Sequence, residues 1–146
     1  MKSRQILSNP KTFVVVFASG EEASQGLAEF ARSHQIMAAS LTAIGALERC
    51  TLGYFSWERK EYQKIQIDEQ VEVLAMIGNF ADKEGKPQLH AHLVVGKADG
   101  SAHGGHLLEA LVRPTLEVTI VEAPVHLRRK FDAASKLALI DPAAGG

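Results

Sequence analysis

The sequence predicts an α+β fold, in which one main helix packs on a largely antiparallel sheet. One amphipathic helical pattern follows an early apolar strand pattern, and six further strand patterns come after it. Strands that follow one another without intervening helices are joined most simply by hairpins, so we expect antiparallel pairing. The 146 residues, 46% of them hydrophobic, are enough for the core of one domain spanning residues 1–146 and leave no room for a second.

The first strand and the helix are predicted from adjacent patterns. The run Lys11–Ala18, KTFVVVFA, is rich in β-branched residues and predicts a buried strand. Glu21 and Glu22 are expected in the first turn of the following helix, where the helix dipole favours acidic side chains. Apolar residues then recur at helical spacing up to about Ser33, which predicts a helix packed on the sheet. The residues of this helical face are Ala23, Leu27, Phe30, Ala31 and His34.

The remaining strand patterns are rich in β-branched and other apolar residues. They cover residues 37–46, 49–57, 62–67, 72–80, 88–96 and 115–122. The segment 81–87 contains Gly and Pro and is expected to form a turn. Residues 106–111 are compatible with a short helical turn or with another strand, and Pro114 is predicted to end that element. The core is therefore expected over about residues 11–122, followed by a C-terminal tail, 123–146.

Three histidines are candidate metal ligands. His90 and His92 alternate within a predicted strand, so they share one face of it, and apolar neighbours occupy the other. Asp99-Gly100 is a favoured hairpin dipeptide, and a two-residue turn there would return His106 close to His92. Three neutral imidazoles bind Zn²⁺ or a similar divalent ion and leave one coordination position open. The alternative is that these side chains face water or hydrogen-bond to neighbouring groups.

Other polar residues are secondary candidates. Glu117 lies in the middle of a predicted strand, and Glu109 is the nearer acid to His106 in sequence. Either carboxylate could orient a ligand or act as a base, whereas the structural alternative is a surface glutamate. His103 is expected to face solvent. The two other histidines are expected to be ordinary surface or helix-end residues, namely His34 and His126.

Composition narrows the classes of function. Sixteen Lys and Arg against seventeen Asp and Glu give a net charge of −1, so no global positive field attracts nucleic acid or anionic lipid. The cluster Arg128-Arg129-Lys130 is expected to be a solvated face, with phosphate or nucleic-acid contact as the alternative. The single cysteine, Cys50, cannot form an internal disulfide and is expected in the core or the sheet. The absence of a signal-peptide pattern and of a membrane-length apolar run predicts a cytoplasmic protein.

Five segments follow one another along the chain: AIGAL (43–47), VEVLAMIGNFA (71–81), GKPQLHAH, GGHLLEA and TLEV. In this order they resemble the PPC (plant and prokaryote conserved) domain family, over about residues 14–122. The HAH pair followed by GGHL is the specific part of the match. The resemblance implies a curved antiparallel sheet with a packed helix, assembled as a homotrimer. It also matches His90, His92 and His106 to histidine positions of the family.

DNA binding is treated separately, because prokaryotic members of the family are often called DNA-binding by analogy. In plants the domain follows AT-hook segments that bind the minor groove. This chain has no Arg-Gly-Arg-Pro core, and its nearest string, EGKPQ, lacks the arginines that would enter that groove. Direct DNA binding is therefore not expected of this domain.

Three functions are compatible with these features. The first is a homotrimeric ligand-binding or assembly module with a divalent metal ion, expected to be zinc, on the three histidines, where the ion is either structural or recruits a small anionic ligand. The second is an enzyme that uses metal-activated water on a small molecule, with Glu109 or Glu117 as proton acceptor. The third is a regulatory protein that contacts DNA through a partner or through the Arg128-Arg129-Lys130 cluster. The charge balance argues against the third, and the sequence does not separate the first two.

Overall fold

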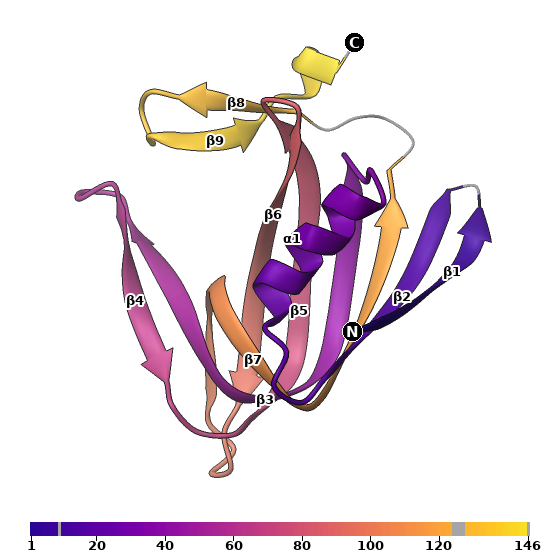
Figure 1. Cartoon of the computed structure of the whole chain (residues 1–146). Helices are drawn as coiled ribbons and strands as arrows, with labels where there is room; N and C mark the ends of the chain where they lie inside the picture. The colour runs from indigo at the N-terminus through magenta and orange to yellow at the C-terminus, as the bar shows by residue number, and fades with distance from the viewer. Residues whose placement is uncertain (9, 124–127, 146) are drawn as a thin grey trace.

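The computed structural model, which describes residues 1–8, 10–123 and 128–145, has one main helix against a mostly antiparallel sheet (Figure 1). The predicted α+β class is confirmed. The first elements are β1 (Lys2–Ser8), β2 (Lys11–Ala18), α1 (Ala23–Ser33), β3 (Ala39–Ser56) and β4 (Glu61–Ile67). They are followed by β5 (Val71–Lys83), β6 (Lys86–Gly96), β7 (Ala102–Glu122), β8 (Arg129–Asp132), β9 (Leu137–Ile140) and a 3-10 helix, η1 (Pro142–Gly145).

The acidic residues before α1 cap the helix. The helix begins at Ala23, and the carboxylate of its N-cap, Glu22, accepts hydrogen bonds from two backbone N–H groups of the first turn, at 2.7 and 3.0 Å. The same carboxylate accepts a bond from the Ala110 N–H at 2.9 Å and so ties the helix to β7. The prediction that Glu21 and Glu22 lie inside the first turn is wrong, because the capping carboxylate reaches the free N–H groups from outside the helix.

The apolar face of α1 is buried as predicted. Its buried side chains are Ala23, Leu27, Phe30 and Ala31. His34 is the C-cap residue, which confirms its expected place at a helix end, and its ring stacks on Phe30 with centroids 4.0 Å apart. Cys50 is buried in β3, also as expected. The helix therefore packs on the sheet through one continuous core.

Two long strands replace four predicted elements. The predicted strands 37–46 and 49–57 overlap the single strand β3 (Ala39–Ser56), and residues 106–111 and 115–122 belong to the single strand β7. The prediction that Pro114 ends an element is wrong. Pro114 lies in β7 between two stretches of paired residues and has no partner in the registers with β2 or β3, so its missing N–H costs no ladder hydrogen bond.

Pairing of β3 with β7 closes the sheet on itself. The strand order is β1-β2-β7-β6-β5-β3-β4, and β7 also pairs with β3, so the chain of neighbours β3, β5, β6 and β7 returns to β3. The sheet consequently curves around α1, as Figure 1 shows. Residues 128–145, which fall in the predicted tail, form the separate β8–β9 hairpin and η1. Figure 1 shows this hairpin at the end of the molecule where β6 begins.

Neither α1 nor η1, the helices of the described ranges, has the length and apolar character needed to span a bilayer. The cytoplasmic location stays a prediction.

Candidate metal centre

The β6–β7 hairpin brings the three histidines together. His92 and His106 are register partners, and His90 lies on the same face of β6 two residues away. The connection, residues 97–101, is longer than a two-residue turn. It is held by a 2.9 Å bond from the Gly100 N–H to the Lys97 carbonyl, with Gly100 at φ +82°. The longer loop still returns β7 in the register that places His106 beside His92.

The spacing of the rings suits a shared ion. One possible ligand atom from each of His90, His92 and His106 can be chosen so that all lie within 4.8 Å of one another. The ring centroids are 4.9 Å apart for His90 and His106, 5.3 Å for His90 and His92, and 5.5 Å for His92 and His106. Nitrogen ligands lie about 2.0–2.1 Å from zinc, so the three rings could share one ion if their nitrogens came closer together.

Backbone packing brings the strands close at this site. Gly78 of β5 pairs with Ala91, the residue between the two β6 histidines. A Cβ atom at Gly78 would lie 2.6 Å from the His90 carbonyl oxygen and 2.7 Å from the Ala91 Cβ. The absence of a side chain at Gly78 therefore permits the local contact between β5 and β6.

Two residues from distant parts of the chain complete the surroundings. The Tyr62 ring of β4 lies against the His106 ring, with centroids 4.7 Å apart. Arg129 of β8 donates through Nη2 to the Asn79 side-chain oxygen at 2.7 Å, and Asn79 is the register partner of His90. Neither Tyr62 nor Asn79 carried a sequence signal for a site, and Arg129 was hidden in a cluster expected to be solvated. The structure corrects that expectation for Arg129, whose side chain is half-buried.

The surroundings of His90 and His106 favour the neutral imidazole, which is the form that binds metal. Burial lowers the pKa of His106 to about 4, together with the charges of His90, His92 and Arg129. Burial, Arg129 and His92 also lower the pKa of His90. The His106 Nδ1 atom is buried and has no hydrogen-bond partner among the described residues. An unpaired buried nitrogen is costly, and an ion among the three rings is a partner that this donor set fits.

The lowered pKa predicts how metal-free protein responds to pH. The folded His106 ring stays neutral down to about pH 4, whereas in the unfolded chain it takes up a proton near its ordinary value of about 6.5. The unfolded state therefore binds more protons between these values, and the free energy of unfolding should fall as pH decreases through that window. Urea denaturation at pH 7 and pH 5 would measure this. A His106→Gln variant should lose less stability between the two pH values, and an equal loss would contradict the prediction.

The secondary candidates lie elsewhere. Glu109 is exposed and lines a separate pocket with Arg49 and Cys50, and a register shift in the β3–β7 pairing separates it from His106. Glu117 is exposed near the other end of β7, opposite Ile44. The structure places neither carboxylate with the three imidazoles. His103 is exposed as expected.

His126, which was expected to be an ordinary surface or helix-end residue, lies outside the described residues.

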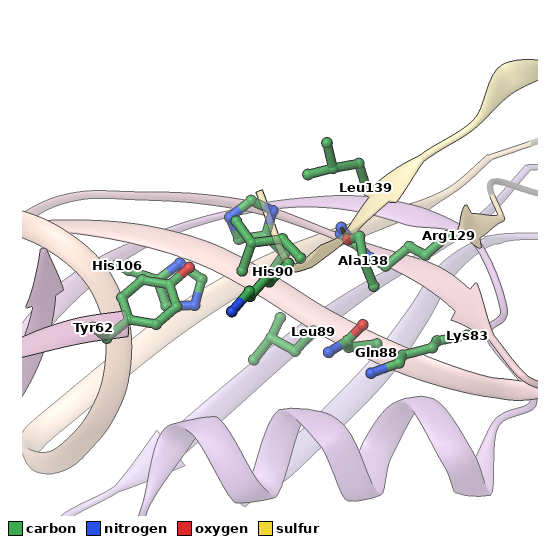
Figure 2. Close-up of a pocket in the computed structure, with 11 residues that line it drawn as sticks. Tyr62, Lys83, Gln88, Leu89, His90, His106, Arg129, Ala138 and Leu139 are labelled. Atoms are coloured by element: carbon green, nitrogen blue, oxygen red, sulfur yellow. Dashed lines mark hydrogen bonds between the residues drawn. The ribbon is translucent and has the colours of Figure 1, made fainter. Parts of the chain in front are cut away.

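A cavity of about 260 Å³ adjoins the histidine cluster (Figure 2). Figure 2 shows Tyr62 and His106 at one side, His90 in the middle and Arg129 beyond it. Aliphatic side chains of β6 and β9 complete the walls, and Lys83 and Lys136 also line the cavity. A ligand in this space would be in reach of both an ion on the histidines and the half-buried guanidinium.

Fold and site together define a class of protein: a small closed antiparallel sheet with one packed helix and a three-imidazole cluster beside a cavity. The chain belongs to the Plants and Prokaryotes Conserved (PCC, also written PPC) domain family, whose model matches residues 4–124. The resemblance found in the sequence is thereby confirmed.

Solved structures similar to this chain carry related descriptions. A metal-containing protein from Archaeoglobus fulgidus is 35% identical, with a TM-score of 0.83 over 90% of this chain and 93% of that one. A Pyrococcus horikoshii PPC protein is 32% identical, with a TM-score of 0.82 over 89% and 90%. A Bacteroides thetaiotaomicron protein, provisionally named DNA-binding, is 28% identical, with a TM-score of 0.86 over 89% and 91%.

Two curated relatives are longer proteins. Both are named bifunctional protein GlmU and come from Synechococcus strains; they are 31% and 30% identical over 71% and 86% of this chain. The matched parts are only 16% and 20% of those proteins, so this chain corresponds to at most about a fifth of their length.

Proposed function

We propose that this chain is a homotrimeric ligand-binding module that holds a divalent metal ion, expected to be zinc, on His90, His92 and His106. The observation that carries the proposal is the convergence of three imidazoles, two of them partly buried, on one strand pair. The half-buried surroundings keep His90 and His106 in the neutral form that coordinates metal. The name of the Archaeoglobus fulgidus neighbour, a metal-containing protein, adds support.

Such an ion would have its three ligands on β6 and β7 and would retain an open coordination position. When bound, it supplies a Lewis acid that can hold an oxygen donor of a small molecule. Tyr62 packs against the His106 ring and limits its rotation. Asn79, across the strand pair from His90, holds the Arg129 guanidinium next to the site.

The sheet face that carries the histidines supports the trimer. Ile77 is the register partner of His92 and is 64% exposed, and Ile44 on the neighbouring strand is 61% exposed. Leu74 and Val94 add apolar surface on β5 and β6. His92 itself is exposed. Two further copies of the chain would remove this apolar surface from water and shield the exposed ligand.

One experiment tests both parts of the proposal. Untagged protein is passed through a sizing column, and its molar mass by light scattering and its metal content by plasma mass spectrometry are measured on the same peak. We expect about three times the 15.8 kDa of one chain and about one divalent ion per chain. A monomer would overturn the assembly. Absence of metal after incubation with Zn²⁺ would overturn the site.

A metal-dependent enzyme is the second candidate, favoured by the cavity beside the histidine cluster. Because Glu109 and Glu117 lie elsewhere, neither is available as the proton acceptor. A water activated on the metal would have to act without them. Contact with DNA is not part of the proposal, since the net charge is −1 and the one half-buried arginine of the basic cluster points toward the cavity.

A further inference from the structure

We infer that the cavity beside the histidines binds a small carboxylic acid, whose carboxylate is held by Arg129 and whose second oxygen donor, a hydroxyl or carbonyl next to the carboxylate, reaches the metal ion. This inference rests on the proposed metal site and names the class of ligand that the site takes. It is carried by the charge, the position and the partners of one arginine.

Arg129 is a cation without a counterion in the described part of the chain. Its half-buried side chain donates to two neutral oxygens, the Asn79 side-chain oxygen at 2.7 Å and the Ala138 carbonyl at 3.1 Å. No carboxylate of the described ranges lies within ion-pair distance of it, and its Nε atom has no partner among the same residues. Removing a charge from water without an opposite charge is unfavourable, so an anion in the cavity would stabilise this arrangement.

The neighbouring Arg128, in contrast to Arg129, is exposed and lies near a carboxylate. Its side chain is 52% exposed and lies 3.9 Å from the Asp82 carboxylate. Successive residues of an extended segment point to opposite sides, so Arg128 faces outward to a carboxylate while Arg129 faces the cavity. The two arginines therefore form a natural pair of test and control positions.

The cavity as a whole is positive. Lys83, Lys136 and Arg129 line it together with His90 and His106, and no acidic side chain is among the lining residues of the described chain. A divalent ion on the imidazoles would add two further positive charges. Electrostatic complementarity thus requires an anionic ligand.

The position of Arg129 sets how that ligand lies. Its guanidinium is anchored on Asn79, and Asn79 is directly across the strand pair from His90, where opposed side chains are about 4.5–5.5 Å apart. One small molecule can therefore contact both the guanidinium and an ion on His90. A guanidinium has two donors suited to the two oxygens of a carboxylate, which leaves an adjacent oxygen for the metal.

The remaining walls favour an organic acid over inorganic phosphate. Leu89, Leu137 and Leu139 provide aliphatic surface that a short hydrocarbon chain can contact. Phosphate has no apolar part to place there. The volume of about 260 Å³ lies below the range of about 300–1,000 Å³ typical of drug-sized ligands, so the acid is small.

The test uses calorimetric titration of the full chain loaded with Zn²⁺. The ligand is 2-hydroxybutyrate, compared with butyrate, which lacks the second oxygen, with 1,2-butanediol, which lacks the carboxylate, and with inorganic phosphate. The variants are Arg129→Gln and the matched control Arg128→Gln, and the zinc content of each is measured before titration. Arg129→Lys is included because it keeps the charge and loses the two-donor geometry.

We expect 2-hydroxybutyrate to bind at least about tenfold more tightly than either organic comparison ligand. Arg129→Gln should weaken its binding at least about tenfold with the zinc content unchanged, Arg129→Lys should be intermediate, and Arg128→Gln should match the wild type. Tighter binding of phosphate, or equal affinities of the Arg129 variants and the wild type, would overturn the inference. Wild-type protein that holds zinc and binds no acid would overturn this inference alone, whereas wild-type protein without zinc would overturn the proposed metal site and this inference with it.

Discussion

Replacing His106 with alanine is expected to weaken metal binding by more than about 100-fold, because loss of a group that merely supports a ligand already costs about 10–100-fold. His106 is one of three imidazoles that can share an ion, and no carboxylate belongs to the candidate cluster in the described residues. Two histidines would remain, both on β6. Competition with a zinc-binding dye would measure the affinity of the wild type and the variant.

His103→Ala is the matched control for this prediction. His103 is the same residue type on the same strand, is exposed, and lies outside the candidate ligand group. Its replacement should leave the zinc affinity within about twofold of the wild-type value, since distant independent sites have little coupling. If His103→Ala and His106→Ala weakened binding equally, the assignment of the three ligands would be wrong.

Gly45→Ala is expected to destabilise the fold by more than about 3 kcal/mol, combining backbone strain with overpacking. Gly45 lies where β3 pairs with both β5 and β7, and its φ is +149°. A Cβ atom there would lie 2.3 Å from the Thr115 carbonyl oxygen and 2.8 Å from the Leu116 Cα. These are backbone atoms of β7, which cannot move aside without opening the strand pair. Urea denaturation monitored by circular dichroism would give the change in the free energy of unfolding.

Gly85→Ala distinguishes backbone strain from overpacking as the cause of the stability lost in Gly45→Ala. Gly85, in the turn between β5 and β6, also has a positive φ, +80°, but a Cβ atom there would meet nothing within 4 Å. Its replacement should cost only about 1–2 kcal/mol of backbone strain. Similar losses for both variants would show that the close approach of β3 and β7 at Gly45 contributes nothing measurable.

Local patterns in the sequence were sufficient for the helix, for most strands and for the histidine pair. The bounds of β2 match the predicted Lys11–Ala18, because a run of β-branched residues followed by a Ser-Gly break has few alternatives. The period-2 alternation of HAH places His90 and His92 on one face of any strand that contains them. The Asp99-Gly100 signal predicted the return of β7, but the register of His92 with His106 is set by the longer loop, since a two-residue turn at Asp99-Gly100 would pair His92 with Leu107.

Pairing between distant strands was decided only by the tertiary structure. Whether residues 37–57 form one strand or two depends on partners, and β5, β7 and β4 support β3 along its whole length. In the same way, Pro114 is compatible with β7 because the ladders on either side leave it unpaired. Local propensity does not depend on such partners, so the sequence patterns predicted breaks at positions where the folded sheet has none.

In the candidate site, too, some residues could be identified from the sequence and others only from the tertiary structure. The site's three candidate ligands, His90, His92 and His106, are close in sequence on two strands of one hairpin, and the sequence alone was sufficient to select them. Tyr62 and Arg129 come from strands 28 residues before His90 and 39 residues after it, and only the folded sheet and the β8–β9 hairpin bring them to the cavity. Glu109, three residues from His106 in sequence, lines a different pocket beyond a register shift in the β3–β7 pairing. Sequence periodicity fixes which side chains share a face of one strand, whereas the cavity depends on contacts between strands that no local pattern encodes.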